Sequence, residues 1–535
     1  MARKLIARAD QERTVARSAT GMGAAAAVSR AFGAVRVFTI AAVLGTTNLG
    51  NAFGGSNSTS NVLFELLAAG ALSAVLVPSF VGLLDRGDQP DAEELAGELL
   101  GAATVILGLV SIVGIAISPW IAGLLTSAVK DPRVAADQRE LSIVLLWFFI
   151  PQIVLYGLGS ITTAVLTAQR RFLVPALAPI GNTVVMVAFL IAFRVVAGPD
   201  PGLHLSGLEQ ALLGLGGTLG VVAFVAAPTI ALARTGFRLR PRLSRHNDRL
   251  RGLLALSGWA GIQQAFTALL LGAAIIVGGG VEGGVVAYQA GWVLFLAPYG
   301  IIAQPIHTTI LPELVGEVER GAMDAFTASL RWAFDSMTLL LVPLTALSLA
   351  LAVPAMRVLA FGAASGRTGV ALLAAALGSL VLGLLPYGAF FLLARAWYVL
   401  GESRKPAVAG GVAAVIGAGL MAVAGHLTDH AVTVFALGVA HTISFVIATG
   451  ILVVSLRKRI GHWIMPPILP RVLLACAPIA VGVWFVERAW SPSGRFDSAL
   501  ALAVLAPLAA VLYFGIIRLT GTTVTQRSPI TAGSA

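Results

Sequence analysis

Apolar segments long enough to cross a membrane recur along this sequence from one end to the other. A helix of about 20 apolar residues spans the roughly 30 Å of hydrocarbon in a bilayer. Of the 535 residues, 57% are hydrophobic and 11% are charged, whereas about a quarter are charged in an ordinary soluble protein. A membrane β-barrel would show short segments of alternating polarity instead. The long apolar segments therefore predict an all-α polytopic membrane protein.

Positively charged residues orient the predicted helices. Cytoplasmic loops carry an excess of Lys and Arg, and a topology of about 14 spans with both termini in the cytoplasm satisfies this rule. The segment "RTGFRLRPRLSRHNDRLRG" (234–252) carries seven arginines between two spans. It would anchor the topology and contact anionic lipid head groups. Residues 1–23 hold five basic side chains and no apolar core, which predicts a cytoplasmic tail rather than a signal peptide.

The basic segment separates two halves whose landmarks correspond. Pro78 and Pro312 lie 234 positions apart, and Pro151 and Pro386 lie 235 apart. These offsets predict two pseudo-symmetric six-helix lobes in parallel orientation, around a central cavity that carries the substrate. The predicted parts are a tail (1–23), an N-lobe with helices 1–6 (24–234), a basic cytoplasmic linker (235–251), a C-lobe with helices 7–12 (252–455), helices 13 and 14 (468–518) and a C-terminal tail (519–535).

Two arginines lie inside the first predicted span, "AVSRAFGAVRVFTIAAVLGT" (27–46). An arginine at the centre of a bilayer costs at least about 2.5–3.5 kcal/mol unless it faces water or a counter-charge. Arg30 is close enough to the cytoplasmic end of the span to snorkel to the interface. Arg36 lies too deep for that, so we expect it to face a water-filled cavity. Glu65 in the second span is a candidate partner, and a protonated carboxyl in a packed interface is the alternative.

Hydroxyl and amide side chains extend this candidate cavity. Ser29 lies seven residues before Arg36 and shares its face of the helix. Asn51 and Asn61 could form hydrogen bonds with sugar or peptide groups, although a solvated outer loop would explain both equally well.

The predicted duplication extends the cavity into the second half. Gln263 and Gln264 lie 234 positions after Ser29 and Arg30, so the second lobe offers amides where the first offers a cation. We therefore expect the central cavity to have a cationic wall in the first lobe only. Arg395 lies near the cytoplasmic end of its span and is expected to snorkel to the interface.

Motifs of enzymes and ion channels are absent from the sequence. With four lysines in the chain there is no G-x-x-x-x-G-K-[ST] phosphate loop, and neither H-E-x-x-H nor G-x-S-x-G occurs. Cys476 is the single cysteine, so no intramolecular disulfide forms. We expect a transporter and not an enzyme, with no cofactor, metal site or nucleic-acid partner. Buried arginines favour an anionic substrate, because Arg binds phosphate oxygens through a bidentate fork.

Several segments resemble one family over nearly the whole chain. "VSRAFGAVRVFTIAAVLG" and "NAFGGSNSTSNVLFELLAAGALSAVLVPSF" are similar to the first two spans of the MurJ/MviN lipid II flippases. "IPQIVLYGLGSITTAVLTAQRRFLVPALAPIGN" and "LLPYGAFFLLARAWYVLGESRKPAVA" resemble the junctions of spans four and five and of spans ten and eleven. Their form is typical of actinobacterial members. The family belongs to the superfamily of multidrug, oligosaccharidyl-lipid and polysaccharide exporters.

This resemblance implies two lobes, a central cationic cavity for an undecaprenyl-linked peptidoglycan precursor, and a terminal helix pair with a hydrophobic groove for the lipid tail. The two first-span arginines of the family match Arg30 and Arg36. Some positions depart from the family. Val37 and Asn51 stand where the family often has acidic residues, an arginine late in span two falls at Phe64 or Glu65, and its span-eight arginine has no counterpart here.

The predicted function is the flipping of lipid II from the inner to the outer leaflet of the bacterial cytoplasmic membrane by alternating access. Arg36 and Arg30 would hold the pyrophosphate, and the membrane potential is the natural driving force. Membrane lipids and proteins of cell-wall synthesis are the further expected partners. The predicted substrate-binding residues are Ser29, Arg30, Arg36, Asn51, Asn61, Glu65, Gln263 and Gln264.

Three other functions remain open at this stage. A flippase for another polyprenyl-linked glycan would fit the same residues. A multidrug antiporter would need an intramembrane carboxylate, for which Glu65 is the central candidate. A scaffold in cell-wall assembly would tolerate the change Arg36→Ala.

Overall fold

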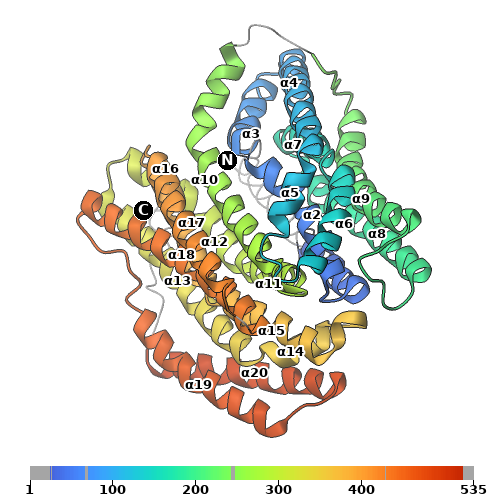
Figure 1. Cartoon of the computed structure of the whole chain (residues 1–535). Coiled ribbons are helices and arrows are strands. Elements are labelled where there is room, and N and C mark those ends of the chain that lie inside the picture. The colour runs from blue at the N-terminus through green and yellow to red at the C-terminus, as the bar shows by residue number, and fades with distance from the viewer. Residues whose placement is uncertain (1–24, 26, 67–69, 243–247, 428, 522–535) are drawn as a thin grey trace. The chain divides into compact units, whose positions relative to one another are not determined.

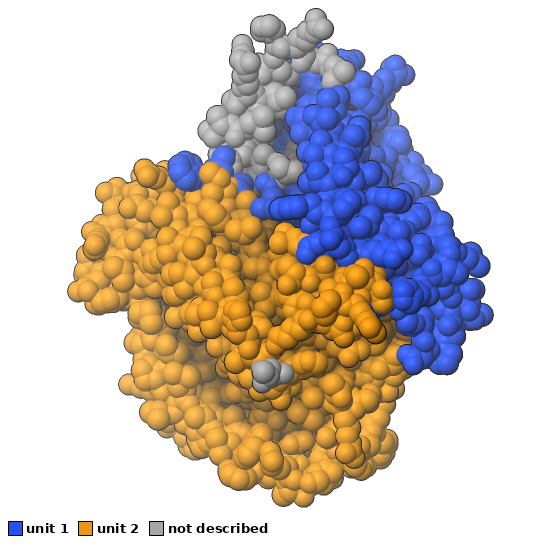
Figure 2. All heavy atoms as spheres, viewed as in Figure 1, with its two compact units in different colours: residues 1–39, 56–123, 139–261 blue, residues 40–55, 124–138, 262–535 orange. Residues whose placement is uncertain are grey.

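The computed structural model describes residues 25, 27–66, 70–242, 248–427 and 429–521. All regular secondary structure in these residues is helical, and they contain no strand (Figure 1). This confirms the predicted all-α class. The described residues form two compact units, which Figure 2 shows in separate colours. Unit 1 comprises residues 1–39, 56–123 and 139–261, and unit 2 comprises residues 40–55, 124–138 and 262–535.

The described residues contain 12 helices that are long and apolar enough to cross a membrane, or 13 if one bent pair forms a single span. The predicted count of about 14 is therefore not confirmed. The second predicted span accounts for part of the difference. It falls on α2 (Asn48–Phe64) and α3 (Gly70–Leu84), of 17 and 15 residues, and residues 67–69 between them lie outside the described residues. Neither piece reaches the length of a full span.

Unit 1 is built mainly from the helix over Ala27–Leu44 and from helices that pack side by side on α7 and α9. Glycines of α9 allow the close approach. A Cβ atom at Gly217 would meet the ring of buried Phe149, and one at Gly216 would meet Phe189. Small residues have this role in many membrane helix pairs. The bounds of the remaining helices are α4 (Gln89–Ala116), α5 (Ser118–Leu125), α6 (Pro132–Phe149), α7 (Gln152–Ala168), α8 (Leu173–Ala197) and α9 (Gly207–Ala233).

The start of the predicted basic linker packs against α4 within unit 1. The Arg242 backbone N–H donates to the carbonyl of Gly97 at 2.9 Å, and the Arg242 guanidinium lies 3.8 Å from the Glu94 carboxylate. Carbonyl groups of the linker lie directly over Gly97 and Gly101, where any side chain would collide with them. The first part of the basic segment therefore packs on α4 at this end of the unit.

Unit 2 contains most of the remaining helices, and its core includes a cluster of aromatic side chains. The Tyr288 hydroxyl lies 2.9 Å from Nδ1 of His441, and both side chains are buried. The rings of Trp292 and Phe295 pack against His441. The bounds are α10 (Asp248–Gly278), which is shared with unit 1, α11 (Gly284–Pro298), η2 (Tyr299–Ala303), α12 (Gln304–Glu319), α13 (Met323–Ala350), α14 (Ala352–Leu359), η3 (Gly362–Ser365), α15 (Arg367–Val381), α16 (Leu384–Val399), α17 (Arg404–Ala424), α18 (His430–Ile460), α19 (Leu469–Trp490) and α20 (Arg495–Leu519).

A single π-helical turn, η2, joins α11 to α12, so that one apolar stretch runs over Gly284–Glu319. Pro305 at the start of α12 has no backbone N–H to donate to the preceding turn. The π-turn accommodates the proline and keeps the helix continuous. The prolines of this stretch thus change its hydrogen-bond register and leave the span unbroken.

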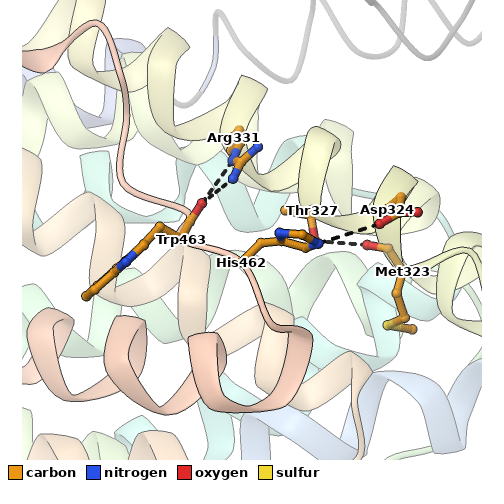
Figure 3. A network of polar contacts seen from close by, with 6 residues as sticks. All are labelled: Met323, Asp324, Thr327, Arg331, His462 and Trp463. Carbon is orange, nitrogen blue, oxygen red and sulfur yellow. Dashed lines mark hydrogen bonds and ion pairs between the residues drawn. The ribbon is translucent and has the colours of Figure 1, made fainter.

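Polar contacts fix the segment between α18 and α19 to α13 (Figure 3). Nε and Nη2 of Arg331 donate to the carbonyl of Trp463 at 2.9 and 2.5 Å. Nε2 of His462 lies 3.9 Å from Oδ1 of Asp324, near the start of α13. These contacts set the position at which α19 begins, and α19 then packs along α13.

Candidate substrate-binding site

Arg36 is a cation without a counter-charge in the first helix of unit 1. Its side chain is partly exposed, whereas the following residues, from Val37 to Gly45, are buried. The hydroxyl of Tyr156 on α7 interacts electrostatically with its guanidinium. Among the described residues no carboxylate lies within ion-pair distance of Arg36. An unbalanced arginine in a membrane-spanning helix is by default a candidate for a functional site.

Tyr156 connects Arg36 to the second predicted span. Its hydroxyl interacts with the side chain of Asn61, which lines the same cavity, and its ring lies 5.6 Å from the ring of Phe64, centroid to centroid. The sequence analysis missed this residue. It stands within the conspicuous segment "IPQIVLYGLGS", but a tyrosine inside a span reads equally well as packing or as part of an interfacial belt.

A cavity of about 460 Å³ within unit 1 is lined by this tyrosine and by several other polar side chains, among a larger apolar surface. One stripe of α7 supplies hydroxyl groups, because Tyr156, Ser160, Thr163 and Thr167 follow one another at helical spacing. Helix α2 supplies the Asn61 amide and, just beyond its end, the Glu65 carboxyl. The remaining lining residues are Phe64, Val77, Gly159, Ala164 and Phe224.

The chemistry of this cavity suits a polar ligand with many oxygens. Hydroxyl and amide groups donate to and accept from sugar and peptide groups. Arg36 is not part of the lining, but it interacts with Tyr156 and carries a planar fork of donors that suits phosphate. Of the predicted site residues, the structure thus brings Arg36, Asn61 and Glu65 to one region of unit 1. Ser29 is buried and Arg30 partly exposed on the first helix, and neither lines this cavity.

Asn51 uses its side chain to hold the start of α2 within unit 2. Nδ2 donates to the carbonyls of Val281 at 2.7 Å and Gly279 at 3.5 Å, and Oδ1 accepts from the N–H of Val285 at 3.0 Å. The residue is 2% exposed. Gly283 in the same turn has φ +74° and lies directly against Thr46, a position open only to glycine. An aspartate could not donate to these carbonyls, which explains why an amide stands here. A contact of Asn51 with substrate stays a prediction.

Gln263 and Gln264 lie on α10 in unit 2. Gln263 is buried, and its Oε1 accepts a hydrogen bond from the Tyr398 hydroxyl. Gln264 is partly exposed.

An apolar groove of about 180 Å³ lies between α13, α19 and α20 in unit 2. Tyr513 lines the groove, and its hydroxyl donates to the carbonyl of Leu339 at 2.8 Å. The polar group of this side chain is therefore satisfied by the protein. Cys476 faces the same space. The remaining lining residues are Leu340, Pro343, Leu344, Ala346, Leu347, Ile479, Ala480, Ala509, Ala510 and Phe514. The groove involves the terminal helix pair for which the sequence resemblance implies a lipid-tail groove.

Comparisons with known proteins agree with this architecture. The family model "Lipid II flippase MurJ" matches residues 40–505. A probable lipid II flippase MurJ of Rhizobium meliloti (strain 1021) is 23% identical over 512 residues, which cover 92% of each chain. The match to the family model begins after Arg36, so the first-helix arginines lie outside it.

Solved structures show the same fold. A lipid II flippase MurJ in an inward closed conformation gives a TM-score of 0.73 at 15% identity, over 93% of this chain and 98% of that one. An inward-facing multidrug transporter of the MATE family and the MOP superfamily gives a TM-score of 0.64 at 14% identity, over 81% of this chain and 98% of that one. The chain therefore has the transporter fold of this superfamily, and it belongs to the lipid II flippase MurJ family.

Proposed function

We propose that this protein transports lipid II from the inner to the outer leaflet of the bacterial cytoplasmic membrane by alternating access. Membership of the lipid II flippase family supports this proposal, and so does the likeness to a flippase solved in an inward closed conformation. The observation that carries it is the uncompensated Arg36 beside the cavity of unit 1. The family makes the protein a multi-pass transporter and not an enzyme.

In this proposal Arg36 binds the pyrophosphate of the substrate. A guanidinium donates two parallel hydrogen bonds to phosphate oxygens, and such charge-assisted bonds are strong in a site that excludes water. Arg30 and Ser29 assist from the preceding turns of the helix. Asn61 and the hydroxyl stripe of α7 contact the sugar and peptide groups, and Glu65 accepts hydrogen bonds from them. Gln263 and Gln264 contribute from unit 2.

The groove of α13, α19 and α20 is proposed to hold part of the polyprenyl tail. Its apolar lining makes transfer of a hydrocarbon from lipid close to neutral, so it guides the tail without trapping it. Both termini are proposed to lie in the cytoplasm, with proteins of cell-wall synthesis as partners. The membrane potential is the proposed driving force, since it supplies about 2.3 kcal/mol per charge per 100 mV.

The test measures lipid II on the outer leaflet of cells depleted of their own flippase. These cells express either the wild-type chain or the variant Arg36→Ala, and accessibility to an external lipid II-cleaving probe is the readout. We expect the wild type to restore accessibility and the variant to reduce it at least tenfold, because a lost charge-assisted hydrogen bond costs about 1.5–3 kcal/mol. Arg194→Ala is the matched control. Arg194 also lies in a membrane helix of unit 1, where it donates to the carbonyl of Gly198 at the helix end.

Each outcome has a distinct meaning. An inserted wild-type chain that restores no accessibility would contradict the assignment to lipid II and favour another polyprenyl-linked glycan. Equal restoration by wild type and Arg36→Ala would leave the transport assignment intact and remove Arg36 from the site.

A further inference from the structure

Unit 2 has a cation of its own inside a membrane-spanning helix. Arg395 lies one turn before the end of α16, and its side chain is partly exposed. Nη1 contacts Nδ1 of buried His307 at 3.1 Å and donates to the carbonyl of Phe391 at 3.2 Å. Nε and Nη2 form no hydrogen bond with any described residue, and no carboxylate there lies within ion-pair distance of Arg395. Arg395 is therefore held on one side and open on the other.

His307 orients this guanidinium without neutralising it. Arginine has donors only, so Nδ1 of His307 must accept, and the ring hydrogen resides on Nε2. The imidazole is then neutral. No carboxylate among the described residues balances the positive charge of Arg395, whose partners there are the neutral imidazole and the carbonyl of Phe391. A snorkelling arginine also has no need of a buried histidine on α12 to fix its direction.

Two neighbouring side chains add further hydrogen-bonding groups beside Arg395. Tyr398 follows it by one turn of α16 and interacts electrostatically with its guanidinium. The Tyr398 hydroxyl donates to Oε1 of Gln263 on α10. This bond fixes the orientation of the Gln263 amide, whose N–H groups have no partner among the described residues. Free donors of the Arg395 guanidinium on α16 and of the Gln263 amide on α10 thus lie near one another, and no carboxylate of the described residues lies within ion-pair distance of Arg395.

Free donors with a net positive charge and no acid select an anion. The planar fork of Arg395 fits two oxygens of a phosphate group, and the amide of Gln263 supplies a third donor. A neutral sugar would need acceptors as well as donors, and this cluster offers few. Phosphate esters occur both in a polyprenyl diphosphate and in ordinary anionic phospholipids.

We propose that Arg395, oriented by His307, forms with Tyr398 and Gln263 an anion site of unit 2 that binds the diphosphate of the transported lipid. The inference rests on the proposed function and deepens it. It replaces the expectation that only the first lobe is cationic. The diphosphate then has one arginine in each unit, Arg36 and Arg395, for different stages of transport.

The test is a binding measurement on the purified full chain in nanodiscs of zwitterionic phosphatidylcholine. The probes are a short-chain polyprenyl diphosphate, the uncharged prenol of the same length, and phosphatidylglycerol. Arg395→Gln is expected to weaken diphosphate binding at least tenfold and to leave prenol binding unchanged. Arg395→Lys keeps the charge without the fork, so we expect an intermediate loss. If Arg395→Gln fails to insert into the membrane, Arg395→Lys still tests the contact between residue 395 and the diphosphate. Arg331→Gln is the matched control. It removes an arginine of α13 that donates to the carbonyl of Trp463, and this variant should bind the diphosphate as the wild type does.

The outcomes separate the inference from the proposed function. Equal diphosphate affinity for wild type and Arg395→Gln would overturn the inference alone. A uniform loss for diphosphate and prenol would also overturn it, because that pattern indicates a purely structural residue. If Arg395→Gln affected phosphatidylglycerol only, the site would belong to a resident phospholipid and the assignment to the transported lipid would be wrong. A wild-type chain that binds no diphosphate would contradict both proposals.

Discussion

Polar side chains in this protein are of two kinds. Some have their hydrogen-bonding groups satisfied within the protein, and others are left with unused donors. Asn51 belongs to the first kind, because three backbone groups of a turn engage its amide. Arg36 and Arg395 belong to the second. The sequence predicts Arg36 to be a deep charge, since depth follows from position in a span. It could not reveal the bonds of Asn51, because Val281 and Val285 are 230 and 234 residues away.

The change Asn51→Asp should destabilise the protein. It replaces the Nδ2 donor by an oxygen that faces the carbonyls of Val281 and Gly279, and an unsatisfied buried group costs about 1–3 kcal/mol, more if it is charged. We expect a lower Tm in thermal unfolding monitored in detergent. Asn57→Asp is the control, because Asn57 lies on the same helix, is partly exposed and forms no hydrogen bond within the described chain. An equal drop in Tm for both variants would contradict the structural role of Asn51.

Helices in this protein are matched to one another by small residues at their contacts. Apolar length alone predicted most of the spans. It failed at α2 and α3, where each piece is too short to span by itself. Composition also could not say which glycines matter. Gly217 faces the ring of Phe149, whereas Gly207 at the start of the same helix has open space around it.

We expect Gly217→Ala to lower the Tm and Gly207→Ala to leave it nearly unchanged. The added methyl group at position 217 must displace Phe149, which is buried at 0% exposure. Overpacking of this kind costs typically about 1–3 kcal/mol. Thermal unfolding of both variants in the same detergent is the measurement. A Tm of Gly217→Ala at or above that of wild type would show that α6 and α9 pack more loosely than the structure indicates.

At the scale of the whole molecule, the orientation in the membrane follows from charge rather than from shape. The sequence predicts both termini in the cytoplasm by the distribution of Lys and Arg. The fold and the family do not depend on this choice, so it needs its own experiment. Cys476 is the single cysteine and is buried, which gives a low background for labelling introduced thiols.

We expect Asp200→Cys to react with a membrane-impermeant thiol reagent in intact cells. Arg320→Cys should react only after the cells are permeabilised, because the two exposed loops lie on opposite sides in the predicted topology. Mass-shift labelling on a gel measures both, and the parent chain without either change is the control. The reverse pattern would place both termini outside the cytoplasm.

The π-helical turn between α11 and α12 gives this molecule an unusual sensitivity to chain length. Each residue of a helix advances its side chains by roughly 100°. The π-turn already holds one residue more than the α-helical turn that it replaces, so deleting one residue from Tyr299–Ala303 would restore a regular α-helix with α12 still in phase, whereas inserting one further residue would rotate α12 by that angle. His307 would turn away from Arg395 although every residue of the anion site was still encoded. One extra codon in this short stretch should therefore disable transport as thoroughly as the loss of the arginine, whereas the loss of one codon should leave α12 in place.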